Sequence, residues 1–412
     1  MKNLLYYVLL ATSVSASSCN NDGTAASNTK NTQDTLSPVE TQKANTAYQP
    51  AFKGQTRANG AQTTTAYEGT VLAEGLQSPW GIAVLPDGRL MISEKEGTLR
   101  IVNNTGTISE AITLLPVDTE GQGGVLGIEV DPDFATNRMV YWAFTLPEKN
   151  GNQTALAKGR LSDDEKTIEN ATVIYKANPI YDGKLHYGGR FLFDKDGNIL
   201  LTIGERSDAE TRPQAQDLKS ALGKIVKITK DGKPASGNPF EGNKDALPEI
   251  YSYGHRNPQG VAFHPQTGDL WATEFGPRGG DELNRIEAGK NYGWPVITYG
   301  IEYSGKEIGT PPIQQQEGME QPVYYWDPVL SPSGITFYTG TAIPEWNNNL
   351  FIAGLSSTHI ARLIIDENNK VVGEERLLAK EGQRFRDIVQ GNDEALYAIT
   401  DSGKLYKIAV KK

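Results

Sequence analysis

The sequence predicts an all-β fold, a six-bladed β-propeller, that follows a short leader and a polar tether. Three observations predict it. Segments of alternating apolar and polar residues recur along the body of the chain and are separated by turn residues. Hydrophobic residues make up 38% of the 412 residues and glycine occurs 43 times, which suits many short strands joined by tight turns. A spare strand also precedes the first repeat, and in a propeller such a strand completes the last blade.

The first 18 residues have the features of a secretory signal peptide. Lys2 is followed by an apolar run over residues 4–11, which is too short to span a bilayer, and small residues lead to Cys19. Cys19 is the only cysteine, so no disulfide forms within the chain. Its position resembles the lipobox of bacterial lipoproteins, which implies a lipidated Cys19 and a periplasmic or outer-membrane-anchored protein. The alternative is an ordinary signal peptide that is cut nearby and leaves a free thiol.

Residues 19–66 are expected to form a disordered tether after the lipid anchor. The stretch is rich in Thr, Asn, Gln, Ala and Ser and has few large apolar side chains to offset the entropy of ordering. The propeller domain then covers residues 67–412. The chain has a net charge of −10 and therefore no excess of basic residues. This argues against nucleic acid and anionic membrane surfaces as partners of the propeller domain. We expect membrane contact only through the anchor, and a monomer or a homodimer.

Six copies of one pattern, each a strand, a turn with Gly, Asp, Asn or Pro, and a second strand, indicate six blades. The copies span residues 80–93, 127–144, 189–204, 260–274, 334–354 and 386–400. The segment 67–75 is the spare strand, which we expect to pair with the last blade and close the ring. The inner strands then surround a central channel, so that residues at the edge of different blades meet there.

Several polar residues stand immediately before the inner strands, where the repeat alone does not require them. They are Gln122, His186, Arg256 with Asn257, Gly276 with Pro277, and Arg384 with Arg386.

The motifs around these residues resemble those of the soluble quinoprotein glucose dehydrogenases and their aldose sugar dehydrogenase relatives, the glucose/sorbosone dehydrogenase family. The matching runs are GQGGVLG at 121–127, LHYGGRFLFDKDGN at 185–198, YGHRNPQG at 253–260, EFGPRGGDELN at 274–284, NYGWP at 291–295 and RFRD at 384–387. The resemblance covers nearly all of residues 67–410. It implies oxidation of the anomeric hydroxyl of an aldose to a lactone, with pyrroloquinoline quinone (PQQ) and Ca²⁺ as cofactors.

The resemblance also assigns roles to the cavity residues. It makes His186 the general base, and histidine suits this role because its pKa lies near neutrality. It places Arg256 at the quinone oxygens, with Asn257 beside it, where a guanidinium stabilises developing negative charge. Arg384 and Arg386 are implied to bind cofactor carboxylates, which arginine holds in a bidentate manner. It places Gln122 near the base and the substrate.

Two calcium sites are implied by the same resemblance. The main-chain oxygens of Gly276 and Pro277 would hold the cofactor's Ca²⁺, an ion that takes oxygen ligands. The Glu282 side chain and the Tyr292 carbonyl would hold a second ion.

One position departs from the family pattern. Ser356 stands where the resemblance expects a lysine against the cofactor. A hydroxyl donates one hydrogen bond but brings no charge, so the affinity for the cofactor is in question. Leu185, before the expected base, also lacks the carboxylate that orients the base in some glucose-oxidising members.

Two other functions remain open on the sequence. A calcium-dependent propeller hydrolase, such as a lactonase, needs acidic ligands that converge on the channel, whereas the residues here are Gln, His and Arg. A non-catalytic lipoprotein that binds glycans or partners is favoured only by Ser356. For the enzyme, the substrate is a small sugar and the electrons leave to a separate acceptor, because the chain has no haem motif.

Overall fold

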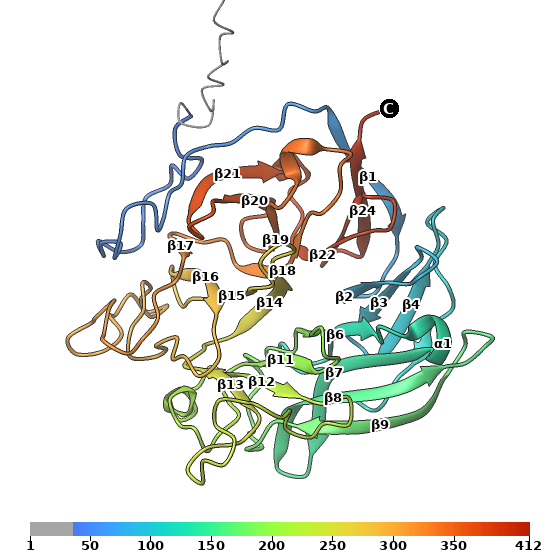
Figure 1. The fold of residues 1–412 in the computed structure, drawn as a ribbon, viewed down its shortest axis with the longest axis horizontal. Coiled ribbons are helices and arrows are strands. Elements are labelled where there is room, and N and C mark those ends of the chain that lie inside the picture. The colour runs from blue at the N-terminus through green and yellow to red at the C-terminus, as the bar shows by residue number, and fades with distance from the viewer. Residues whose placement is uncertain (1–35) are drawn as a thin grey trace, which may run out of the picture.

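The computed structural model describes residues 36–412, and its strands form six four-stranded antiparallel sheets arranged in a ring (Figure 1). This confirms the predicted six-bladed β-propeller. Each copy of the repeat supplies the two inner strands of one blade, because turns such as Asp-Gly and Gly-Asn reverse the chain after three to six extended residues. The first strands of neighbouring blades contact one another all the way round the channel.

In hydrogen-bonding order from the channel outward, the first blade consists of β2 (Pro79–Val84), β3 (Leu90–Glu94), β4 (Thr98–Val102) and β5 (Ile112–Thr113). The second blade consists of β6 (Val125–Val130), β7 (Met139–Glu148), β8 (Gly151–Leu161) and β9 (Ile168–Lys176). The third blade consists of β10 (Phe191–Phe193), β11 (Ile199–Ile203), β12 (Lys224–Ile228) and β13 (Ile250–Tyr253). The fourth blade consists of β14 (Pro258–Phe263), β15 (Leu270–Glu274), β16 (Asp281–Ile286) and β17 (Tyr324–Trp326). The fifth blade consists of β18 (Pro332–Phe337), β19 (Leu350–Gly354), β20 (Ile360–Ile365) and β21 (Val371–Leu377). The sixth blade consists of β22 (Phe385–Gln390), β23 (Leu396–Thr400), β24 (Lys404–Val410) and β1 (Tyr67–Glu74).

Helices are short and lie between strands. They are α1 (Phe134–Asn137) and the 3₁₀ turns η2 (Arg212–Ala215), η3 (Pro344–Trp346) and η4 (Ala379–Glu381). Among residues 36–412, no helix has the length and apolar character needed to cross a membrane.

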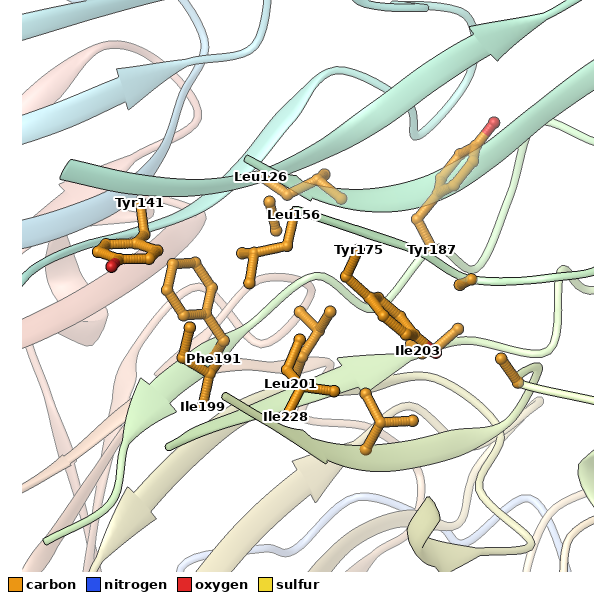
Figure 2. Close-up of a cluster of buried hydrophobic side chains, with 14 of the residues drawn as sticks. Leu126, Tyr141, Leu156, Tyr175, Tyr187, Phe191, Ile199, Leu201, Ile203 and Ile228 are labelled. Carbon is orange, nitrogen blue, oxygen red and sulfur yellow. The ribbon is translucent and has the colours of Figure 1, made fainter. Parts of the chain in front are cut away.

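The cores lie between blades, where the apolar faces of neighbouring sheets meet. Figure 2 shows Leu126 and Leu156 of the second blade packed toward Phe191 and Leu201 of the third, and all four side chains are buried. Tyr187 extends this cluster toward the start of β10, directly after the expected base. The interblade packing therefore fixes the position of the residue next to His186.

The ring closes as the spare strand predicts. β1 pairs with β24 in antiparallel register, with Tyr67 opposite Val410. The last blade thus combines strands from both ends of the propeller domain.

Residues 36–66, which we call the N-terminal strap, are ordered and lie along blades four and five, so the disordered tether is wrong for this part (Figure 1). Asp327 accepts hydrogen bonds from the Asn45 amide (2.8 Å) and the Thr46 hydroxyl (3.1 Å). Further along, the Thr63 hydroxyl donates to Glu375 (2.7 Å). The strap has few large apolar side chains, and hydrogen bonds to carboxylates on the propeller hold it instead.

The predicted signal peptide, Cys19 and the first part of the tether lie outside the described residues.

Candidate active site

A cavity of about 350 Å³ opens at one end of the channel, where the first strand of each blade begins and the second strand ends. Antiparallel pairing places these two points side by side, so all six blades contribute to its wall. The lining residues are Trp80, Lys95, Gly121, Gln122, Leu126, His186, Tyr187, Gly188, Arg256, Gln259, Phe275, Tyr303, Ser331, Leu355, Ser356, Arg384 and Arg386. None of them is acidic.

The structure brings together most of the residues singled out in the sequence. Gln122, His186, Arg256, Ser356 and the pair Arg384–Arg386 all line this one cavity.

His186 is buried, with 6% of its surface exposed, and its ring is held by a carboxylate. Its Nδ1 lies 2.6 Å from Oε1 of Glu205, which also accepts a hydrogen bond from the Ser207 amide (3.1 Å). An oxygen that already accepts from a backbone N–H is best paired with a protonated Nδ1, and this leaves Nε2 unprotonated. Burial and the positive charges of nearby arginines, Arg256 first, lower the pKa of His186 well below 6.5.

Gln122 fixes the backbone of the same residue. The side-chain oxygen of Gln122 accepts a hydrogen bond from the backbone amide of His186 (2.9 Å), and the backbone amide of Gln122 donates to the Lys184 carbonyl (2.8 Å). His186 has a φ of 50°, in the left-handed region that non-glycine residues rarely adopt. Gln122 therefore helps to hold a backbone conformation that aims the imidazole at the cavity.

Arg256 crosses the floor of the cavity from the start of β14. Its Nη1 donates to the carbonyls of Phe275 (3.0 Å) and Gly276 (2.7 Å), and its guanidinium lies over the Trp294 ring at 5.2 Å. Its buried Nε has no partner among the described residues. A buried, unsatisfied donor on a cation is suited to an anionic ligand.

Arg384 and Arg386 share one carboxylate. Their Nε atoms lie 2.9 Å and 2.8 Å from the two oxygens of Asp401, which sets both guanidinium groups on the same side of β22. Ser356 belongs to the fifth blade, which neighbours the last one; it hydrogen-bonds to the Ser331 hydroxyl (2.8 Å) and brings no charge to the wall.

Asn257 lies one layer below the cavity rather than on its wall. It is fully buried, and its side-chain oxygen accepts from the amide of Gly188 (3.0 Å) and the side chain of Gln259 (3.2 Å). The structure thus gives Asn257 a place in the scaffold of the site, where it fixes the turn after His186.

The expected calcium residues lie beside Arg256, around a second, small cavity of about 10 Å³. Gly276, Pro277, Glu282 and Tyr292 all line it, together with Glu274. Loss of hydration and the neighbouring Glu274 raise the pKa of Glu282 well above its usual value. Two close carboxylates around a space for one small ion fit a divalent cation, which would remove their repulsion.

The fit of calcium at Gly276 and Pro277 is weaker. The Gly276 carbonyl accepts a hydrogen bond from Arg256, so a cation bound to that oxygen would lie next to a guanidinium. Carbonyl oxygens are suitable calcium ligands, and the guanidinium would need to turn toward the cavity to relieve the repulsion. Within residues 36–412, no three Asp, Glu, His or Cys side chains are grouped as a metal site.

Sequence reasoning missed two residues, Glu205 and Lys95. Glu205 follows β11 and holds the base, and Lys95 follows β3 and lines the cavity. The residues singled out in the sequence are those that precede the inner strands. In each blade the end of the second strand lies next to the start of the first strand, so residues there also reach the cavity. A polar residue directly after a second strand is therefore the sequence signal that indicates Glu205 and Lys95.

Comparisons with known proteins identify the family of the chain. The family model described as glucose / sorbosone dehydrogenase matches residues 76–407. The aldose sugar dehydrogenase YliI of Escherichia coli is 39% identical over 82% of this chain and 92% of its own.

Two solved structures extend the likeness to three dimensions. The soluble aldose sugar dehydrogenase of Escherichia coli in its apo form, 37% identical, has a TM-score of 0.79 over 84% of this chain and all of its own. The PQQ-bound aldose sugar dehydrogenase of Streptomyces coelicolor, 30% identical, has a TM-score of 0.69 over 85% of this chain and all of its own. With its fold, its motifs and these matches, the chain belongs to the glucose/sorbosone dehydrogenase family.

Proposed function

We propose that the protein is a PQQ-dependent aldose sugar dehydrogenase that oxidises the anomeric hydroxyl of an aldose to a lactone. The observation that carries the proposal is a buried His186–Glu205 pair that faces a cavity with cationic walls. A histidine held in this way accepts a proton, and the walls suit a polyanionic cofactor.

His186 and Glu205 act together in the removal of the proton. Nε2 of His186, which makes no hydrogen bond within the described residues, takes the proton of the C1 hydroxyl. Glu205 holds the imidazole in the required tautomer and stabilises it once it is charged. The chemistry that bound PQQ would supply is that of a hydride acceptor for C1.

The cations of the wall account for cofactor binding. Arg384 and Arg386 are placed to bind cofactor carboxylates, and Arg256 is placed to stabilise negative charge on the quinone oxygens. The reducing equivalents then pass to a separate acceptor.

The two alternative functions have less support. An acidic metal site of the lactonase type has no counterpart among residues 36–412. A binding protein without catalysis needs no buried carboxylate behind its cavity-lining histidine.

The decisive experiment replaces the base without leaving Glu205 unpaired. The amide of His186→Asn still donates to Glu205 but accepts no proton, so we expect turnover to fall by about 10²- to 10⁴-fold, the usual effect of a lost general base. Single-turnover reduction of bound cofactor by sugar, followed by absorbance, measures it.

His264→Asn is the matched control. His264 follows β14, at the opposite end of that strand from Arg256, and its ring packs against Phe337. We expect it to retain wild-type rates. Reduction at the wild-type rate by His186→Asn would show that another group is the base.

Calcium is the second part of the proposal, supported by the Glu282–Glu274 pair around the small cavity that Gly276 and Pro277 also line. We expect chelation to abolish sugar-dependent dye reduction and added Ca²⁺ to restore it, because the ion offsets buried negative charge. Metal analysis alongside the assay checks the result. Full activity in metal-free protein would exclude a calcium requirement.

A further inference from the structure

Lys95 is a cavity-wall residue to which neither the motifs nor the relatives assign a role. It follows β3 in the first blade, next to the last blade that carries Arg384 and Arg386. Its Nζ donates to the Gly121 carbonyl (3.0 Å), and within the described residues it forms no ion pair. Lys95 is therefore a cation without a carboxylate partner on the wall of the cavity.

The backbone of Lys95 is fixed from both sides. Its amide donates to the Ser78 carbonyl (3.1 Å), and its carbonyl accepts from the Val125 amide (2.9 Å), which ties blade one to blade two at this point. The side chain alone remains free to move.

Gly124 provides the space for that side chain. It has a φ of 141°, and a Cβ at this position would lie 2.4 Å from Cγ of Lys95 and 2.8 Å from its carbonyl oxygen. Any other residue would displace the lysine stem or the backbone that holds it. The glycines of the 121–124 loop thus shape one side of the cavity around Lys95.

The charges of the wall show what Lys95 adds. Asp401 offsets one of the two charges on Arg384 and Arg386, and ionised Glu205 offsets one more beside Arg256, so one net positive charge remains without Lys95. PQQ carries three carboxylates, which are ionised at neutral pH. Lys95 adds a second net positive charge to the wall of the cavity, whereas the hydroxyl of Ser356 adds none.

We propose that Lys95 binds a carboxylate of the anionic cofactor, together with Arg384 and Arg386. The inference rests on the proposed function, because it needs PQQ as the ligand of the cavity. A flexible ammonium suits this role, since it can leave the Gly121 carbonyl and turn toward the ligand as it binds.

The test is an equilibrium titration of full-length apoprotein with PQQ in the presence of Ca²⁺, followed by tryptophan fluorescence. Lys95→Met keeps the apolar stem and removes the charge, and we expect its Kd to rise roughly tenfold to a hundredfold. Lys95→Arg should keep the affinity within a few-fold of wild type. Added salt should weaken binding by wild type more than binding by Lys95→Met.

Two further variants make the result decisive. Lys184→Met removes a lysine from the neighbouring loop, where it pairs with Glu120 and is 57% exposed, and should leave Kd unchanged. Arg386→Met should weaken binding. If Lys95→Met bound as tightly as wild type while Arg386→Met did not, the role of Lys95 would be refuted but the cofactor site would stand. If wild type bound no PQQ, the proposed function itself would fail.

Discussion

The protonation of the His186–Glu205 pair determines when the base is available. Burial raises the pKa of Glu205 to about 7, an effect that Arg256 and other nearby cations reduce, while His186 has a lowered pKa. As the pH falls, the first proton taken up by the pair therefore goes to Glu205. A protonated Glu205 donates to Nδ1 of His186, and the proton of the neutral ring then lies on Nε2. Nε2 can therefore no longer accept a proton from the sugar.

The titration of Glu205 predicts the acid limb of the pH profile. We expect kcat/KM for sugar oxidation to fall as the pH drops through about 7, because activity needs Glu205 ionised. Glu205→Gln removes the titrating group, so its kcat/KM should be about 10²-fold lower and should lose the limb near pH 7. A pH–rate series on both proteins measures this, and an unchanged limb in Glu205→Gln would assign it to another group.

The residues that sequence reasoning found are those whose chemistry is visible locally. His186, Arg256 and the Arg384–Arg386 pair stand out because a charged or basic side chain directly precedes or enters an inner strand. Glu205 does not stand out, because its role depends on a partner 19 positions earlier in the chain and on burial. Nor does the sequence distinguish Asn257, which lies beneath the cavity, from Arg256, which lies in it.

Among the larger elements, the blades were predictable and the N-terminal strap was not. Each blade repeats the same alternation and turn chemistry, which a single sequence displays openly. The strap has the polar composition of a disordered segment and is ordered through long-range contacts instead. Asn45 and Asp327, for example, are 282 positions apart.

The anchoring of the strap can be tested at Asp327, which is 4% exposed. Its two oxygens accept four hydrogen bonds from Asn45 and Thr46. We expect Asp327→Ala to release the strap, at a cost of about 2–4 kcal/mol in local stability, because four part-buried donors lose a charged acceptor. Limited proteolysis with mass spectrometry should then show rapid cleavage within residues 36–66.

Asp245→Ala is the control, since Asp245 is an exposed acid paired only with Lys219. It should leave the strap as resistant as in wild type. Equal resistance in Asp327→Ala would mean that Glu375 and the other strap contacts suffice.

At the level of the complete ring, the β1–β24 pairing holds the two ends of the domain together. Deletion of residues 404–412 removes β24, which leaves β1 without a partner strand and β23 paired with β22 alone. We expect this variant to lose the cooperative thermal transition seen by circular dichroism. Removal of Lys411 and Lys412 alone, which lie beyond β24, should lower the midpoint only slightly. A cooperative transition in the larger deletion would show that the ring closes without β24.

The same closure sets the order of events during synthesis. β1 emerges early, and its partner β24 begins 337 positions later, which is roughly 20–70 s of translation at 5–20 residues per second. During that interval β1 is an unpaired strand edge that is open to wrong partners. Since Arg384 and Arg386 also come from the last blade, the cavity is completed only when the chain is nearly finished. A nascent chain therefore needs protection of its first strand long before it has a place for its ligand.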